Sequence, residues 1–185
     1  MLGLALLTGS IHVQAAAPPP VVGAEPIAAS WKRHSYSFQF IGYTSTYSCD
    51  GLADKLKELL LAAGARKDVK SVPHCSSNWG TPDKLASAEL TFYSLEPQAD
   101  AGASVVKSAI GAWRSVQFTV RSPTDLERGD CELVAQFRQH LLPLFTTRNQ
   151  VDTTNCVTHD VLGSHVDLRF ETLAAAPISD AARRP

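Results

Sequence analysis

Hydrophobic residues follow two different spacings along the chain, and each spacing indicates one type of secondary structure. Over residues 33–43, aromatic and β-branched side chains alternate with polar ones, which is typical of a strand. Over residues 52–63, leucine and alanine recur at i, i+4, i+7, i+8 and i+11, which predicts one face of a helix that Gly64 ends. A short strand over 69–73 and a longer one over 85–95 are predicted to follow.

The second half of the chain repeats this order of elements. A strand is predicted over 114–121, and strands over 149–156 and 164–173 close the half. Between them lies a helix, which Pro143 is expected to end or kink near Leu142. This helix carries the apolar residues Leu133, Phe137, Leu141 and Leu144. Each half therefore has the order strand, helix, strand, strand, or βαββ.

Short stretches of sequence recur between the two halves in the same order. Residues 37–40 (SFQF) resemble residues 115–118 (SVQF), and residues 88–92 (AELTF) resemble residues 166–170 (VDLRF), both at a shift of 78 positions (115 − 37 and 166 − 88). The pair Cys49-Asp50 matches Cys131-Glu132 at a shift of 82 (131 − 49), and Trp31-Lys32 and Trp113-Arg114 open the two copies. Four matches in one order predict an internal duplication.

We therefore predict an α+β fold of two duplicated βαββ units that are similar to a ferredoxin-like fold, each closed by its own disulfide. One helix is expected to cover the apolar face of each small sheet. The predicted segments are a signal peptide over 1–17, a flexible linker over 18–30, the first unit over 31–95, a linker over 96–112, the second unit over 113–173 and a disordered tail over 174–185. The pattern leaves open whether the six strands form one continuous sheet or two layers.

The four cysteines lie at matching places in the two units. Cys49 and Cys75 are 26 residues apart (75 − 49), and Cys131 and Cys156 are 25 apart (156 − 131). If the strands on either side of each helix are parallel, both cysteines of a unit lie at the same edge of its sheet. We therefore predict the disulfides Cys49–Cys75 and Cys131–Cys156, each of which stabilises its unit by about 3.5 kcal/mol on a loop-closure argument.

A reactive thiol and a zinc site are the alternatives for these cysteines. A helix N-terminus lowers the pKa of a thiol, but Asp50 and Glu132 beside the thiols raise it again, and no C-x-x-C motif is present. A zinc site made of four thiolates needs closely spaced pairs, and these cysteines are evenly scattered. The spacing favours structural disulfides.

Charge and composition argue against nucleic acid as a partner and against a membrane span. The 185 residues include 17 basic and 18 acidic side chains, for a net charge of −1, with no run of Lys or Arg long enough to follow a phosphate backbone. The 44% hydrophobic content is that of a globular protein. No apolar stretch is long enough to cross a bilayer.

The beginning of the sequence resembles a secretory signal. An apolar run extends to Val13, and small residues follow around Ala16, as before a cleavage site. No Lys or Arg precedes Lys32, so the usual basic start of a signal is missing, and a disordered Ala- and Pro-rich leader is the alternative. We expect a periplasmic or secreted protein, because disulfides persist in such compartments.

The histidines form no spacing that would place two imidazoles on one face of an element, and no catalytic or cofactor motif is present, so we predict no cofactor. His74 and His159 each lie close in sequence to a cysteine of a predicted disulfide. The alternative function is therefore metal binding or catalysis at the interface of the repeats. Around these two histidines, such a site would draw on the carboxylates of Asp50, Asp130 or Asp160.

Trp79 lies in a polar loop over 74–82 that has no counterpart in the second unit. Aromatic side chains dominate the energetics of many interfaces, so Trp79, with His74 and His159, is a candidate binding residue, and burial against the sheet edge is the alternative. We expect an exported, non-enzymatic binding or assembly module of the bacterial periplasm or cell envelope. Its partner would be another envelope protein or a cell-wall component, bound at an exposed sheet edge or by the loops at the disulfide end.

Overall fold

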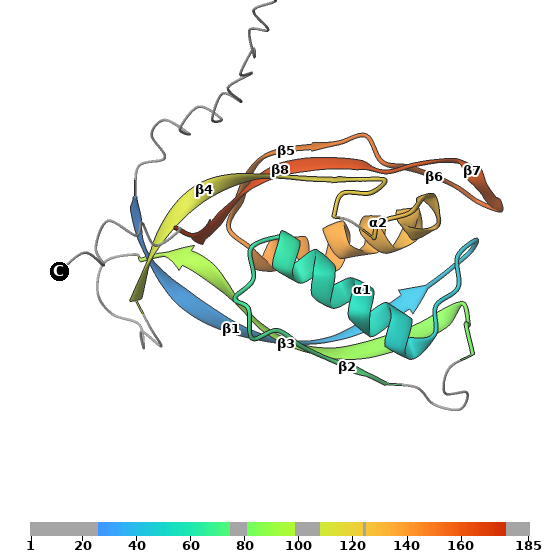
Figure 1. Cartoon of the computed structure of the whole chain (residues 1–185), viewed down its shortest axis with the longest axis horizontal. Coiled ribbons are helices and arrows are strands. Elements are labelled where there is room, and N and C mark those ends of the chain that lie inside the picture. Colours follow the sequence, from blue (N-terminus) through green and yellow to red (C-terminus); the bar gives the residue numbers. More distant parts are fainter. Residues whose placement is uncertain (1–25, 75–80, 99–107, 124, 177–185) are drawn as a thin grey trace, which may run out of the picture.

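The computed structural model describes residues 26–74, 81–98, 108–123 and 125–176, which fold as an α+β protein (Figure 1). Within these ranges, eight strands, two α-helices and two short 3₁₀ helices follow one another. Their bounds are β1 (Ile27–Ile41), α1 (Cys49–Ala62), β2 (Lys70–Pro73), β3 (Leu85–Pro97), β4 (Ser108–Thr119), η1 (Arg128–Asp130), α2 (Cys131–His140), η2 (Leu142–Leu144), β5 (Thr147–Asp152), β6 (Asn155–Val157), β7 (Asp160–His165) and β8 (Asp167–Ala175).

Six of the strands form one continuous antiparallel sheet in the order β2-β3-β1-β4-β8-β5, which answers the question that the pattern left open. The first half of the chain supplies β2, β3 and β1, and the second supplies β4, β8 and β5. The halves meet where β1 pairs with β4 over only four residues, Ile27–Ser30. Beyond this junction the two halves diverge, and both helices lie between them (Figure 1).

The helix α1 begins and ends as its sequence predicts. The side chain of Ser48 accepts a hydrogen bond from the backbone N–H of Gly51 and caps the first turn. Gly64, at φ +104°, follows the last turn, where its N–H donates to Leu61 O and the N–H of Ala65 donates to Leu60 O. Two such bonds around a residue with positive φ form a Schellman motif, which favours glycine.

The helix α2 is shorter than its apolar spacing predicts. It ends at His140, and the predicted helix positions Leu141 and Leu144 lie in the turn that follows, Leu144 being in the 3₁₀ helix η2. Pro143 lies in this turn, where its missing N–H costs no helical hydrogen bond. The predicted end near Leu142 is therefore confirmed to within two residues.

One hydrophobic core joins both halves of the sheet to both helices. The apolar face of α1 (Leu52, Leu56, Leu59 and Leu60) is buried in it, as predicted. Among the aromatic residues, Phe38 and Phe92 come from the first half and Phe118 from the second, where its ring contacts those of Phe137 and Phe170. The halves therefore share a core and are not separate layers.

The second half differs from the predicted βαββ order by an additional two-stranded ribbon. The single strand predicted over 149–156 is interrupted at Thr153 and Thr154, and β6 and β7 then pair with each other. The N–H of Thr154 donates to the carboxylate of Asp152, and Thr154 Oγ1 accepts from the N–H of Asp167. These side-chain bonds replace the regular ladder and explain the break.

Strands also extend into segments that were predicted as linkers or tail. Residues 27–30 and 108–112 belong to β1 and β4, because these two segments pair with each other, and Ala174 and Ala175 belong to β8. This long-range pairing has no signature in the local sequence. Residues 18–25, 99–107 and 177–185 of these segments, and the predicted signal over 1–17, lie outside the described residues.

The register of the two halves corrects one predicted equivalence. Trp31 lies opposite Leu95 and Trp113 lies opposite Leu173, so the shifts are 82 on one strand (113 − 31) and 78 on the other (173 − 95). Phe38 lies opposite Ala88, whereas Val116 lies opposite Phe170, so the two sequence matches at a shift of 78 cannot both mark equivalent positions. Residues 37–40 do not match residues 115–118 once residues 88–92 are matched to 166–170.

No helix in the described part of the chain is long and apolar enough to cross a membrane.

Candidate binding surface

One end of the molecule, at the left in Figure 1, carries a second and smaller hydrophobic cluster. Trp31, Leu95 and Leu173 are buried in it, and Tyr93 and Trp113 are half-buried. Trp31 is an odd number of residues from Phe38 in an unbroken strand, so its side chain points to the face opposite the main core. We call these five residues, with Arg66 and Arg148, the tryptophan end.

An arginine stacks over the aromatic rings on each side of this end. The Cζ atom of Arg66 lies 3.7 Å from the ring centroid of Tyr93 and 5.7 Å from that of Trp31, and Cζ of Arg148 lies 4.2 Å from that of Trp113. At exposed sites such cation–π contacts contribute about 0.5–1 kcal/mol each. A guanidinium therefore lies over an aromatic ring on each side of this end.

A carboxylate orients each of these arginines. Arg66 donates two hydrogen bonds, of 2.7 and 2.6 Å, to Asp68, and Arg148 donates one of 2.5 Å to Glu171. The hydrogen bonds with Asp68 raise the pKa of Arg66, and those with Arg66 lower the pKa of Asp68. Both groups are therefore charged at neutral pH, and the guanidinium plane is held against the rings.

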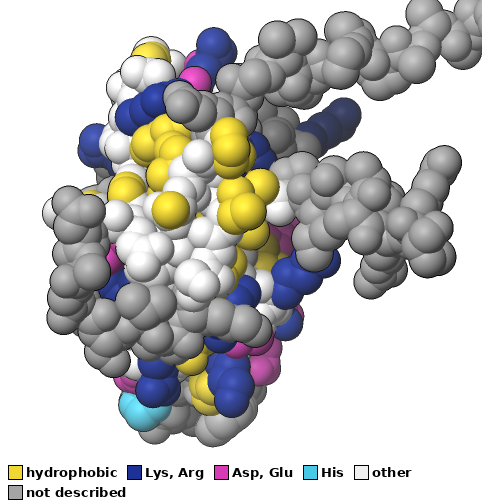
Figure 2. Space-filling view, turned by 90° about the vertical axis from the view of Figure 1, so that its left-hand side faces the viewer, with side chains coloured by type: hydrophobic (Ala, Val, Ile, Leu, Met, Phe, Trp, Pro, Cys, Tyr) yellow, Lys and Arg dark blue, Asp and Glu magenta, His cyan; other side chains and the backbone are white. Residues whose placement is uncertain are grey.

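Figure 2 looks at this end directly. Hydrophobic side chains gather in the middle of the face, and Lys and Arg side chains border them. Ile110, which pairs with Ala28 in the β1–β4 junction and points to the other face of β4 from Trp113, is 62% exposed. An exposed apolar patch with a charged border is typical of an interaction surface.

A cleft of about 560 Å³ opens beside Trp31, at the C-terminal end of α1. Its apolar lining includes Trp31, Leu61 and Ala174. Its basic lining consists of Arg66 and Lys67, from the loop after α1, and Arg114 from β4, and none of the described residues that line it is acidic. The volume is in the range of small-molecule sites.

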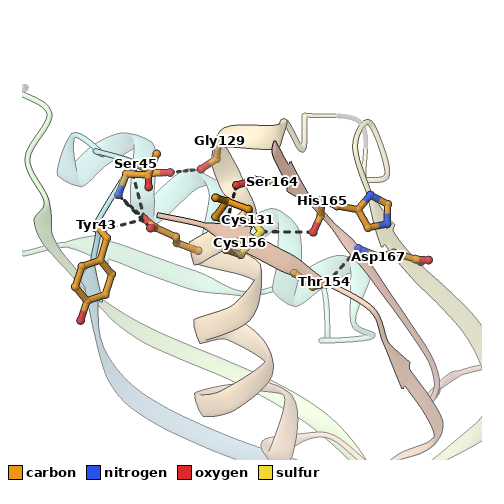
Figure 3. The surroundings of a disulfide bond; sticks show 12 residues. Tyr43, Ser45, Gly129, Cys131, Thr154, Cys156, Ser164, His165 and Asp167 are labelled. Atoms are coloured by element: carbon orange, nitrogen blue, oxygen red, sulfur yellow. Dashed lines mark hydrogen bonds between the residues drawn. A yellow bond between two sulfur atoms is a disulfide. The ribbon is translucent and has the colours of Figure 1, made fainter. Parts of the chain in front are cut away.

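The opposite end of the molecule contains the disulfide Cys131–Cys156, with a Cα–Cα distance of 5.6 Å (Figure 3). The predicted pairing of these two cysteines is confirmed. Cys131 begins α2, and Cys156 lies in β6, just beyond β5. The strands β4 and β5 are parallel to each other, because both are antiparallel to β8. Cys75 lies outside the described residues, so its predicted bond with Cys49 stays a prediction. None of the three described cysteines is a free thiol.

The carboxylate of Glu132, next to this disulfide, holds the loop that follows β1. It accepts hydrogen bonds from three successive backbone N–H groups, those of Tyr43, Thr44 and Ser45, at 3.0–3.2 Å (Figure 3). Successive amides of this kind form an anion-binding nest. Here the chain's own carboxylate fills the nest and ties the first half to the second.

Asp130 makes a second connection between the halves. It is buried, accepts a hydrogen bond from the Tyr47 hydroxyl and forms an ion pair of 3.0 Å with Lys55. The backbone N–H of Glu127 also donates to it, at 2.8 Å. Burial and then the negative charge of Asp130 raise the pKa of Tyr47, so its hydroxyl stays protonated and remains a donor.

The predicted site residues are not gathered into one site in the described part of the chain. His74 follows β2 and exchanges two bonds with Ser87, and the N–H of His159 donates to Thr44 Oγ1 from the turn between β6 and β7. Asp160 accepts a hydrogen bond from the N–H of Gly163 within the same ribbon. The described residues contain no group of three or more His, Cys, Asp and Glu side chains that could hold a metal. Asp50 lies in the first turn of α1, and Trp79 lies outside the described residues.

Sequence reasoning missed the two arginines of the tryptophan end. Each lies 35 positions after its tryptophan (66 − 31 and 148 − 113), so the signal was present in the repeat alignment at a shift of 82. That alignment would have matched Arg66 with Arg148.

No protein-family model, curated protein or solved structure matches the chain.

Proposed function

We propose that this chain is an exported, non-enzymatic binding module of the bacterial periplasm or cell envelope, and that it binds another envelope protein or a cell-wall component at the tryptophan end. The observation that carries this proposal is the concentration of aromatic and arginine side chains on one face, beside an open cleft. Tryptophan, tyrosine and arginine are the residues that dominate binding hot spots.

The disulfide at the opposite end supports the compartment. Cys131–Cys156 closes a loop in a chain of moderate size, and bonds of this kind persist in oxidising environments such as the periplasm. The signal predicted over 1–17 supplies the route of export in this proposal.

We also infer that the two halves arose by duplication of a βαββ unit. The pairs Trp31 and Trp113, Arg66 and Arg148, and Cys49 and Cys131 are each 82 residues apart (113 − 31, 148 − 66 and 131 − 49). The order of strands outward from the centre, β1-β3-β2 and β4-β8-β5, is the same in both halves. A duplication explains why stacked tryptophans occur on both sides of the junction.

The sheet edges offer less support for binding than the tryptophan end. The edge strand β2 has only four residues, and β5 has a register shift between Arg148 and Val151, with Asn149 at φ +52°. Short or bulged edge strands resist the addition of another strand. The alternative of a metal or catalytic site around His74 and His159 has less support too, because Asp130 and Asp160 are bonded within the fold.

Site-specific photo-crosslinking in the cells that make the protein tests this proposal. A photoreactive residue at Ile110, which lies on the same face of β4 as Arg114 of the cleft, should yield a discrete crosslink to an envelope protein or to peptidoglycan. The matched control is Leu162 on the β6–β7 ribbon, which is 80% exposed and equally apolar. The crosslink at position 110 should disappear in the variant Arg148→Glu. Crosslinks at position 162 alone, or protein found only in the cytoplasmic fraction, would contradict the proposal.

A further inference from the structure

The cleft beside Trp31 brings together three basic side chains from two parts of the fold. Arg66 and Lys67 follow the Schellman motif that ends α1, and Arg114 lies in β4 on the other half of the sheet. The whole chain has a net charge of −1, so these residues concentrate positive charge locally. Charge concentrated in a cleft attracts ions of opposite sign.

Two of these three charges are not compensated. Arg66 is paired with Asp68, whereas Lys67 and Arg114 have no ion pair within the described residues. A hydrogen bond of 2.7 Å from Arg114 Nη2 to Ala62 O orients the Arg114 guanidinium at the end of α1. A guanidinium has five N–H donors, so the others are available to a ligand.

Apart from these basic side chains, the described residues that line the cleft are apolar or glycine. Trp31 and Leu61 form apolar walls. The hydroxyl of Thr172 is buried and has no hydrogen-bond partner among the described residues, and it lies 3.4 Å from the place where a Cβ on Gly64 would stand. A ligand suited to this cleft therefore has an anionic group and an apolar part.

We propose that the cleft binds a small organic phosphate monoester, with the phosphate on Lys67 and Arg114 and the apolar part against Trp31 and Leu61. A phosphate monoester carries a charge of about −1.5 to −2 at pH 7, which matches the two uncompensated cations. A carboxylate or the phosphodiester of a lipid headgroup carries one negative charge and leaves one cation uncompensated. This proposal rests on the proposed function as a binding module and names a ligand class for its surface.

Calorimetric titration of the purified chain with phenyl phosphate tests the proposal. Phenyl phosphate should bind more tightly than inorganic phosphate, which has no apolar part, and more tightly than benzoate, which has a single charge. Its affinity should fall between pH 7.5 and pH 5, because the second pKa of a phosphate monoester is about 6. Vesicles of phosphatidylglycerol should not compete with it.

Variants of the two cations locate the site. The double variant Lys67→Gln and Arg114→Gln should bind phenyl phosphate about tenfold more weakly or worse, as expected when charged hydrogen bonds are removed. Lys67→Gln alone should show part of this loss, and it keeps the test valid if the loss of the Arg114 bond to α1 destabilises the fold. The matched control is Lys32→Gln, a basic residue of β1 that is paired with Glu96 outside the cleft, and it should bind like the unaltered chain.

Failure of this proposal can be distinguished from failure of the proposed function. If phenyl phosphate does not saturate, binds the double variant equally well, or is displaced by the vesicles, the phosphate proposal is wrong. If the crosslink from position 110 persists in that case, the proposed function as a binding module is retained and only the phosphate ligand is rejected.

Discussion

Asp130 and His34 are polar side chains buried in the fold, and each has polar or charged partners. Asp130 has the Lys55 ammonium and the Tyr47 hydroxyl as partners. His34 bonds the Ser94 hydroxyl at 2.8 Å and stacks on Phe92, and burial, followed by the positive charge of Lys32, lowers its pKa. Burial therefore favours the neutral ring of His34, whereas Asp130 forms an ion pair and a hydrogen bond with residues of the first half.

The variant Asp130→Asn should lower the free energy of unfolding by about 2–3 kcal/mol, because Lys55 loses its counter-charge in a largely buried place. Urea unfolding followed by circular dichroism measures the change. As a control, Tyr47→Phe removes only the hydroxyl from the same network and should cost about 1 kcal/mol. An Asp130→Asn variant as stable as the unaltered chain would show that this connection between the halves contributes nothing.

His34 should make the protein less stable in mild acid. Its pKa is lowered from 6.5 in the folded state, so below pH 6.5 the unfolded chain binds the proton that the folded chain excludes. The contribution of His34 is fully present above pH 6.5 and is lost as the pH falls toward the folded-state pKa. Urea unfolding at pH 7.5 and 5.5 should show this loss, and it should be smaller in His34→Gln. An equal loss in both proteins would exclude His34 as its source.

Among the elements, the turn after α1 links the helix to the cleft. Its geometry depends on a positive φ at Gly64, and the two residues that bring charge to the cleft, Arg66 and Lys67, follow at once. The N–H of Arg66 donates to Tyr93 O, so the end of this turn is fixed to β3. The turn that ends the helix therefore also determines where Arg66 and Lys67 lie.

The variant Gly64→Ala should lower stability by about 1 kcal/mol or more, because alanine is strained at φ +104° and its Cβ would lie 3.3 Å from Thr172. Thermal unfolding measures this loss. Gly129→Ala is the matched control, since a Cβ there meets nothing within 4 Å, and its midpoint should change little. Equal midpoints for the two variants would argue against strain at Gly64.

In the whole molecule, connections at both ends hold the halves of the sheet together. At the tryptophan end, β1 and β4 pair over four residues, and at the opposite end Glu132 and Asp130 bind the loop after β1 and the side chains of Tyr47 and Lys55. The disulfide Cys131–Cys156 fixes the start of α2, from which both acidic side chains act. The shared core fills the space between these connections.

A non-reducing peptide map of the mature protein tests export and duplication together. We expect the bonds Cys131–Cys156 and Cys49–Cys75, and a chain that starts near residues 16–18. Reduction of Cys131–Cys156 alone should lower stability by about 3.5 kcal/mol on the loop-closure argument, for a loop of 25 residues. Crossed pairing would contradict the duplication, and an uncleaved Met1 would contradict the signal.

Local patterns predicted much of this fold, and contacts between distant residues account for what they missed. The helix end at Gly64 and the pairing of Cys131 with Cys156 follow from spacing and turn chemistry, and both are confirmed. The start of β1 depends on pairing with β4, and the break before β6 depends on side-chain bonds of Thr154, so neither is encoded locally. The cleft was missed for the same reason, since Arg114 and Lys67 meet only through the folded sheet.

The position of Gly111 in the centre of the sheet has a consequence for chain connectivity. Gly111 pairs with Ile27, where β1 begins, on one side and with Ala175, where β8 ends, on the other. The beginning of the first described strand and the end of the last one are therefore two strand spacings apart, about 10 Å. A short peptide joining these ends would close the chain into a ring without disturbing the sheet. The ring could then be opened between β3 and β4, giving a circular permutant in which the second half is synthesised first.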